Sequence, residues 1–135
     1  DNQNITNHNA EIPFHKVDSK GLIPESILAQ EVTYRDQESW EAFWQKYGKE
    51  SPPKIDFTKY MIVGVFLGAK PNPGYRVEIT QVQKDGSHIL VKIVEYIANP
   101  NRTYATIVIY PYCIIYFPKT EGEIIFKVEQ KIVDS

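Results

Sequence analysis

A stripe of aromatic residues is the feature that most restricts the fold. The stripe consists of Trp40, Phe43, Trp44 and Tyr47. This spacing of i, i+3, i+4 and i+7 places four side chains on one face of an α-helix. Asp36 precedes it as an N-cap, and Gly48 follows where a left-handed C-terminal cap is least strained. Burying four aromatic side chains contributes roughly 8 to 12 kcal/mol, so the sequence predicts a helix over 36–47 packed on a sheet. A core face is favoured over a box for an aromatic ligand.

From residue 60 onward the patterns are those of β-strands. Residues 61–68, MIVGVFLG, form a continuous apolar run, which is typical of a central strand buried on both faces. Residues 75–82 alternate apolar with polar side chains and predict a strand with one solvated face. An Asp-Gly turn at 84–87 then leads into a strand over 88–97.

The remaining strands carry weaker signals. They are predicted at residues 12–17, 27–34, 104–108, 110–117 and 124–128, the last with an extension to 132–133. Pro111 marks a bulge or a switch between strands. The predicted fold is therefore α+β: a mainly antiparallel β-sheet, arranged as a sandwich or a partly open barrel, with one amphipathic helix packed on it.

The chain divides into a short leader and one domain. Residues 1–11 lack periodicity and are rich in Asn, so they are interpreted as a flexible leader, and residues 12–135 as a single β-rich domain. The sequence opens at Asp1 in a polar run, which is what remains when a signal peptide or lipid anchor is removed. We therefore expect an exported protein. No stretch approaches the roughly 20 apolar residues of a membrane span.

Charge and motif content argue against several function classes. The 15 basic and 17 acidic residues give a net charge of −2 without a long run of one sign, so nucleic acid is not an expected partner. The three histidines stand far apart, and no metal or other cofactor is predicted. No carboxylate pair, nucleophile elbow, phosphate loop or dinucleotide fingerprint stands out. We expect no enzymatic activity.

The lone cysteine, Cys113, cannot form an internal disulfide bond. Its neighbours are those of a buried strand, where a free cysteine behaves as a small apolar side chain. An inert thiol is the prediction.

Two features exceed what packing alone demands. The turn PNPGY contributes Pro71, Pro73, Gly74 and Tyr75, and is either a shaped hairpin loop or a binding loop. A second group surrounds Pro111 and consists of Tyr104, Tyr110, Tyr112 and Tyr116. Tyrosines at this density are as typical of an interface as of a packed core. The candidate binding residues are Pro71, Pro73, Gly74, Tyr75, Tyr110 and Tyr112.

These segments also carry a family resemblance. Residues 52–79, the strand at 91–96, the Asn99-Pro100 break and YPYCIIYFPK at 110–119 resemble the C-terminal domain of the PrcB family, a subunit associated with a secreted protease complex in spirochaetes. The helix at Trp40 to Trp44 is similar to the element that precedes it there. The most specific parts of the resemblance are IDF and the turn G-x-K-P-x-x-GY. The resemblance implies an exported, non-catalytic domain that binds or stabilises another protein, with a secreted protease as the expected partner.

Two further functions compete with this one. The alternative is a small-ligand binding domain with a pocket between helix and sheet, lined by Trp40 or Trp44 and Tyr75. A hydrolase with carboxylates that the sequence does not pair is less favoured. The oligomeric state is left open.

Overall fold

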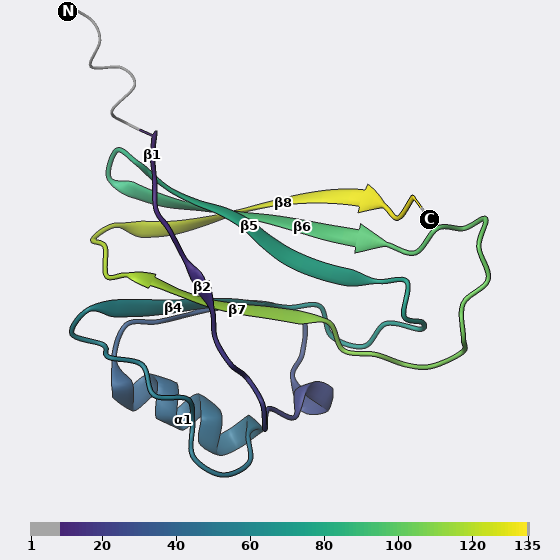
Figure 1. Cartoon of the computed structure of the whole chain (residues 1–135), viewed down its shortest axis with the longest axis horizontal. Coiled ribbons are helices and arrows are strands. Elements are labelled where there is room, and N and C mark those ends of the chain that lie inside the picture. Colours follow the sequence, from purple (N-terminus) through teal and green to yellow (C-terminus); the bar gives the residue numbers. More distant parts are fainter. Residues whose placement is uncertain (1–8, 135) are drawn as a thin grey trace, which may run out of the picture.

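The computed structural model describes residues 9–134 and consists of three layers (Figure 1). Two four-stranded sheets lie face to face, and α1 covers the outer face of one of them. In chain order the elements are β1 (Asn9–Glu11), β2 (His15–Lys16), the short 3-10 helix η2 (Pro24–Ser26), β3 (Gln30–Tyr34), α1 (Gln37–Tyr47), β4 (Tyr60–Phe66), β5 (Arg76–Asp85), β6 (His88–Ile97), β7 (Tyr112–Pro118) and β8 (Glu123–Ile132).

The sheets are mainly antiparallel, as predicted. One has the order β1-β5-β6-β8 and the other β2-β7-β4-β3. Among the described strands, only the pair β6 and β8 is parallel. The sheets do not close into a barrel, so the sandwich is the correct one of the two architectures that the sequence left open.

The position of strand β4 between two cores explains why its sequence is apolar throughout. Met61, Val63 and Val65 belong to the core between the two sheets, whereas Ile62 and Phe66 belong to the core beneath α1. Because side chains alternate across a strand, a strand covered on both faces needs apolar residues at every position. The predicted central strand is confirmed.

The aromatic stripe forms the centre of the helix-side core. Trp40, Phe43 and Trp44 are buried against β4 and β7. The indole N–H of Trp40 donates to the carbonyl oxygen of Pro53 at 3.2 Å, and that of Trp44 donates to the carbonyl oxygen of Lys49 at 3.1 Å. Both buried indole N–H groups thus have a hydrogen-bond partner, as burial requires. The interpretation as a core face is confirmed.

Of the two caps predicted for α1, the one at Asp36 is confirmed and the one at Gly48 is wrong. Asp36 is the N-cap: its carboxylate accepts from the backbone N–H of Ser39 at 2.8 Å, and this bond is the main cause of a lowered pKa for Asp36. The left-handed cap predicted for Gly48 is wrong, since φ is −120° and ψ is 168°. A Cβ at Gly48 would lie 2.4 Å from Cε2 of Trp44. Glycine is required there because the indole ring lies against the backbone.

Both chain ends depart from the prediction. Residues 1–8 of the predicted leader lie outside the described residues, but Asn9–Glu11 form β1 and pair with β5. The strand expected over 12–17 is reduced to the two residues of β2. The closing strand β8 runs through Ile132 without a break and pairs in parallel with β6. These differences arise from pairings between segments far apart in sequence.

Two further strands were predicted with errors. Residues 104–108 form no strand and belong to the connection between β6 and β7. In β5 the register shifts between Ile79 and Gln81, so that Val77, Ile79 and Val82 are the buried residues. A bulge of this kind reverses the alternation after it, which is why Val82 faces the core together with Ile79 although the two residues are three positions apart.

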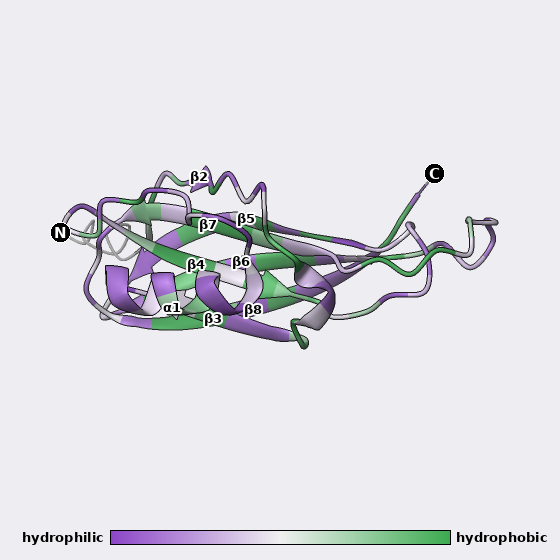
Figure 2. Cartoon of the chain, turned by 90° about the horizontal axis from the view of Figure 1, so that it is seen from below, coloured by the Kyte–Doolittle hydropathy of each residue, from purple (hydrophilic) through white to green (hydrophobic). Residues whose placement is uncertain are grey.

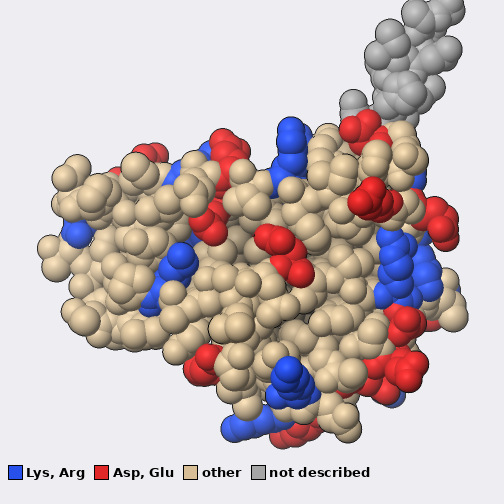
Figure 3. All heavy atoms as spheres, turned by 180° about the vertical axis from the view of Figure 1, so that it is seen from behind, with Lys and Arg blue, Asp and Glu red and all other residues tan. Residues whose placement is uncertain are grey.

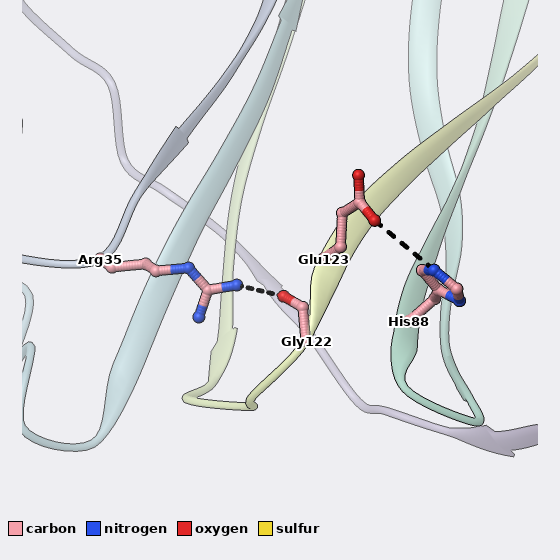
Figure 4. A network of polar contacts seen from close by, with 4 residues as sticks. All are labelled: Arg35, His88, Gly122 and Glu123. Atoms are coloured by element: carbon pink, nitrogen blue, oxygen red, sulfur yellow. Dashed lines mark hydrogen bonds and ion pairs between the residues drawn. The ribbon is translucent and has the colours of Figure 1, made fainter.

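The crossing from β7 to β8 carries the chain from one sheet to the other and is held by polar contacts (Figure 4). The guanidinium of Arg35 donates to the carbonyl oxygens of Thr120 at 3.0 Å and Gly122 at 2.6 Å. Gly122 has φ of 132°, and a Cβ there would lie 2.6 Å from the carbonyl oxygen of Ser87. His88 Nε2 and Glu123 Oε1 are 3.5 Å apart at the start of β6 and β8. The start of β8 is therefore fixed to both sheets.

Cys113 lies on β7 in the core between the sheets, and its burial is the main cause of a raised thiol pKa. Because the thiolate is the reactive species, we expect the folded protein not to react with a thiol reagent at neutral pH over minutes. Addition of denaturant should release one reactive thiol per chain, measured by absorbance of the released thiolate. Stoichiometric labelling of the native protein at the rate of a free thiol would contradict this placement.

Candidate functional site

The predicted binding residues gather mainly at one end of the sandwich. Two long connections meet there: residues 67–75 between β4 and β5, and residues 98–111 between β6 and β7. We call these two segments together the loop end. Figure 2 shows that it projects beyond the ends of α1 and β3.

Hydrogen bonds join the two connections. Lys70 and Ile109 exchange two backbone hydrogen bonds, of 2.8 and 2.9 Å. The hydroxyl of Tyr104 accepts from the backbone N–H of Asn99 at 3.1 Å. Gly74 is buried, and a Cβ there would lie 2.7 Å from the ring of Tyr104. The glycine of the PNPGY turn thus allows Tyr104 to close over the turn.

The prolines and Tyr75 differ in exposure. Pro71 and Pro73 are exposed, and between them the side-chain oxygen of Asn72 accepts from the backbone N–H of Gly74 at 2.8 Å. Tyr75 is half-buried, with the ammonium of Lys70 5.4 Å from the centre of its ring. The turn is therefore shaped by local hydrogen bonds and still presents both prolines to solvent. Its role as a binding loop stays a prediction.

The tyrosines around Pro111 do not form one surface. Tyr112 stacks on Phe66 with ring centres 5.6 Å apart, and its hydroxyl lies 2.8 Å from that of Ser19. Tyr116 also packs on the helix-side core. Tyr110, half-buried, follows the residue that pairs with Lys70. The structure thus brings Tyr104 and Tyr110 to the loop end and assigns Tyr112 and Tyr116 to packing.

Two exposed residues of the loop end were missed by the sequence analysis. Ile107 is 57% exposed and Val108 is 56% exposed. Because Lys70 and Ile109 pair in an antiparallel sense, Val108 lies alongside Pro71. The sequence carried one signal, the absence of any charged residue between Arg102 and Lys119. Figure 3 shows the result: the loop end, at the left, has few charged side chains.

The residues of the predicted ligand pocket are not brought together. Trp40 and Trp44 fill the space between α1 and its sheet, whereas Tyr75 precedes β5 in the other sheet. A hollow of about 550 Å³ lies between α1 and residues 51–57, and another of about 680 Å³ adjoins Lys16, Lys20 and Asp56. Both are open to solvent. Trp40 lines the first of them, but neither hollow is lined by Trp44 or Tyr75.

Residues 9–134 contain no group of three histidine, cysteine, aspartate or glutamate residues placed to hold a metal ion. In the same residues, no helix is long and apolar enough to cross a membrane.

Comparisons with known proteins gave a match to one family model. Residues 61–118 match the family model described as PrcB C-terminal, which confirms the resemblance found in the sequence. The matched residues contain nearly all of β4 together with β5, β6, β7 and the loop end, whereas α1 lies outside them. Neither the curated proteins nor the solved structures gave a match.

Proposed function

We propose that this chain, which carries the PrcB C-terminal match, is a non-catalytic domain that acts outside the cytoplasm and binds or stabilises another protein through its loop end. The proposed partner is a component of a secreted protease complex, the association that the family resemblance implies.

The observation that carries the proposal is the exposed pair Ile107 and Val108. Two neighbouring aliphatic side chains in contact with water, beside exposed Pro71 and Pro73, are typical of a protein interaction surface. The low charge of the loop end supports the same conclusion because charged residues are depleted at interface centres.

The hydrogen bonds between the two connections also favour a role in binding. The backbone of the loop end is restricted by the Lys70–Ile109 pair and by two prolines in the turn. A loop that is already ordered loses less conformational entropy when it associates. The contact residues we propose are Pro71, Pro73, Ile107, Val108 and Tyr110.

A double substitution of the exposed pair tests the function. Ile107→Ser with Val108→Ser should leave the melting temperature within a few degrees, because neither side chain belongs to a core. Removal of a central apolar contact costs roughly 2 kcal/mol or more, so partner affinity should fall by at least about 30-fold. The full chain serves as bait against the envelope and secreted fractions of its native cell, and affinity for the captured protein is then measured by titration.

Ile125→Ser is the matched control. Ile125 is 39% exposed and lies opposite Leu90 near the start of β6, whereas the loop end follows the other end of β6. Its substitution should not change capture of the same partner. If the double variant folds and binds that partner as tightly as the unchanged chain, the loop end is not the contact surface.

A further inference from the structure

Strand β8 is an edge strand with an open side. It lies at one end of the order β1-β5-β6-β8, and among the described strands it pairs only with β6 (Figure 1). Its pairing covers ten residues, from Glu123 to Ile132. Its outer edge therefore presents a long row of backbone N–H and C=O groups to solvent, which is a template for a further strand.

The side chains of β8 are divided between two faces. On the face toward the other sheet, Ile124 and Phe126 pack against the core between the sheets. Val128 and Ile132 follow on that same face, but they are 51% and 59% exposed. The second half of β8 thus carries two exposed apolar side chains, one on each side of Gln130, and the described part of the chain leaves both in contact with water.

The opposite face carries charges in an order that places opposite charges together when two copies of β8 run antiparallel. Along β8 the outward-facing residues are Ile125, Lys127, Glu129 and Lys131. If a second β8 runs antiparallel with Val128 opposite Val128, then Lys127 of each strand lies opposite Glu129 of the other. The same register places Ile124 opposite Ile132 twice. Opposite charges and apolar pairs in these positions stabilise a sheet.

Registers shifted by one or two residues lose this match. A shift of two residues places Lys127 opposite Lys127 or Glu129 opposite Glu129, and like charges directly opposite are destabilising. A shift of one residue sets the apolar row of one strand against the charged row of the other. A register centred on Gln130 also sets Glu129 opposite Lys131 and Val128 opposite Ile132, but because β8 ends at Ile132 it pairs only residues 128–132. The register centred on Val128 pairs residues 124–132, and this longer pairing favours it.

We propose that a second copy of this chain pairs antiparallel with β8 in the register centred on Val128. The two β1-β5-β6-β8 sheets then form one continuous sheet across a two-fold axis, as closed symmetric dimers require. A copy, rather than an unrelated peptide, is indicated because the charges of β8 match those of β8 itself. The pairing is independent of the function proposed for the loop end.

Charge exchange on the full chain tests the pairing. Lys127→Glu and Glu129→Lys are each exposed substitutions that should fold: in the β6 pairing Lys127 faces Lys92, and Glu129 faces Val94. Each change replaces two attractive pairs with two repulsive ones. The dimer dissociation constant from sedimentation equilibrium should rise about tenfold or more.

Two combinations should restore the dimer. The variant with both changes keeps opposite charges across the axis and should associate like the unchanged chain. An equimolar mixture of the two single variants should form a heterodimer, because Lys in one then faces Glu in the other at both positions. If the unchanged chain is monomeric at 0.5 mM, or if neither combination restores association, the proposal is overturned.

A cysteine pair tests the register itself. In the proposed pairing the two copies of position 128 lie about 5 Å apart between Cα atoms, within the range of a disulfide bond. Val128→Cys should therefore form a covalent dimer on mild oxidation. Ile132→Cys is the control, since its two copies would lie about 27 Å apart along the strands. Cross-linking of Ile132→Cys as fast as of Val128→Cys would overturn the register.

Discussion

Trp44→Ala is expected to destabilise the domain by about 3 to 5 kcal/mol, which is a large fraction of the roughly 5 to 15 kcal/mol of an ordinary domain. The indole of Trp44 is buried between α1 and its sheet, and its N–H bonds to the carbonyl oxygen of Lys49. The substitution opens a cavity and leaves that carbonyl without its partner. Denaturant unfolding followed by circular dichroism measures the loss.

Gln45→Ala provides the comparison for this result. Gln45 is exposed and follows Trp44 on the same helix, so its truncation should change the free energy of unfolding by less than about 0.5 kcal/mol. A Trp44→Ala protein with an unchanged melting temperature would show that the stripe does not support the fold, and would revive the interpretation as an aromatic ligand box.

The second large effect is expected at Gly48. A methyl group there would lie 2.4 to 2.7 Å from three atoms of the Trp44 indole, a ring that the core holds in place. Gly48→Ala should therefore destabilise the domain by about 1 to 3 kcal/mol through overpacking. Its backbone is extended, so no strain at positive φ adds to this cost.

A double-mutant cycle separates overpacking from any other effect of Gly48→Ala. In the Trp44→Ala background the ring is absent, and the same substitution should cost little. The two changes should thus be strongly non-additive. Additive losses would place the cause in the unfolded chain or in the backbone of residue 48, instead of at the indole.

The features that the sequence predicted correctly are those with a local pattern. The helix stripe, its N-cap Asp36, the apolar run of β4 and the Asp-Gly turn before β6 each follow from neighbouring residues, and the structure has all of them. For the candidate site, the PNPGY turn was found because prolines and glycines mark turns regardless of what packs around them.

The errors share a different cause. β1 pairs with β5, and β8 pairs with β6, through contacts that no local pattern encodes. Residues 104–108 have the composition of a strand, but a Tyr104 ring closed over Gly74 holds them as a loop. Ile107 and Val108 were consequently assigned to a strand, and their exposure at the loop end was not predicted. The sequence analysis explained Gly48 by a left-handed backbone conformation, whereas a glycine is required at this position because the Trp44 ring lies close to the backbone.

The order of strands separates the segment that matches the family model from the rest of the sandwich. All four inner strands of the sandwich, β4, β5, β6 and β7, fall within the segment that matches the family, whereas all four edges, β1, β2, β3 and β8, are supplied by flanking residues. An inner strand is bonded to a neighbour on each side, and an edge strand on one side only. The matched segment thus contains the strands whose pairing depends on both neighbours, and a change in an edge strand can alter what the sandwich binds without breaking the pairing of the inner strands.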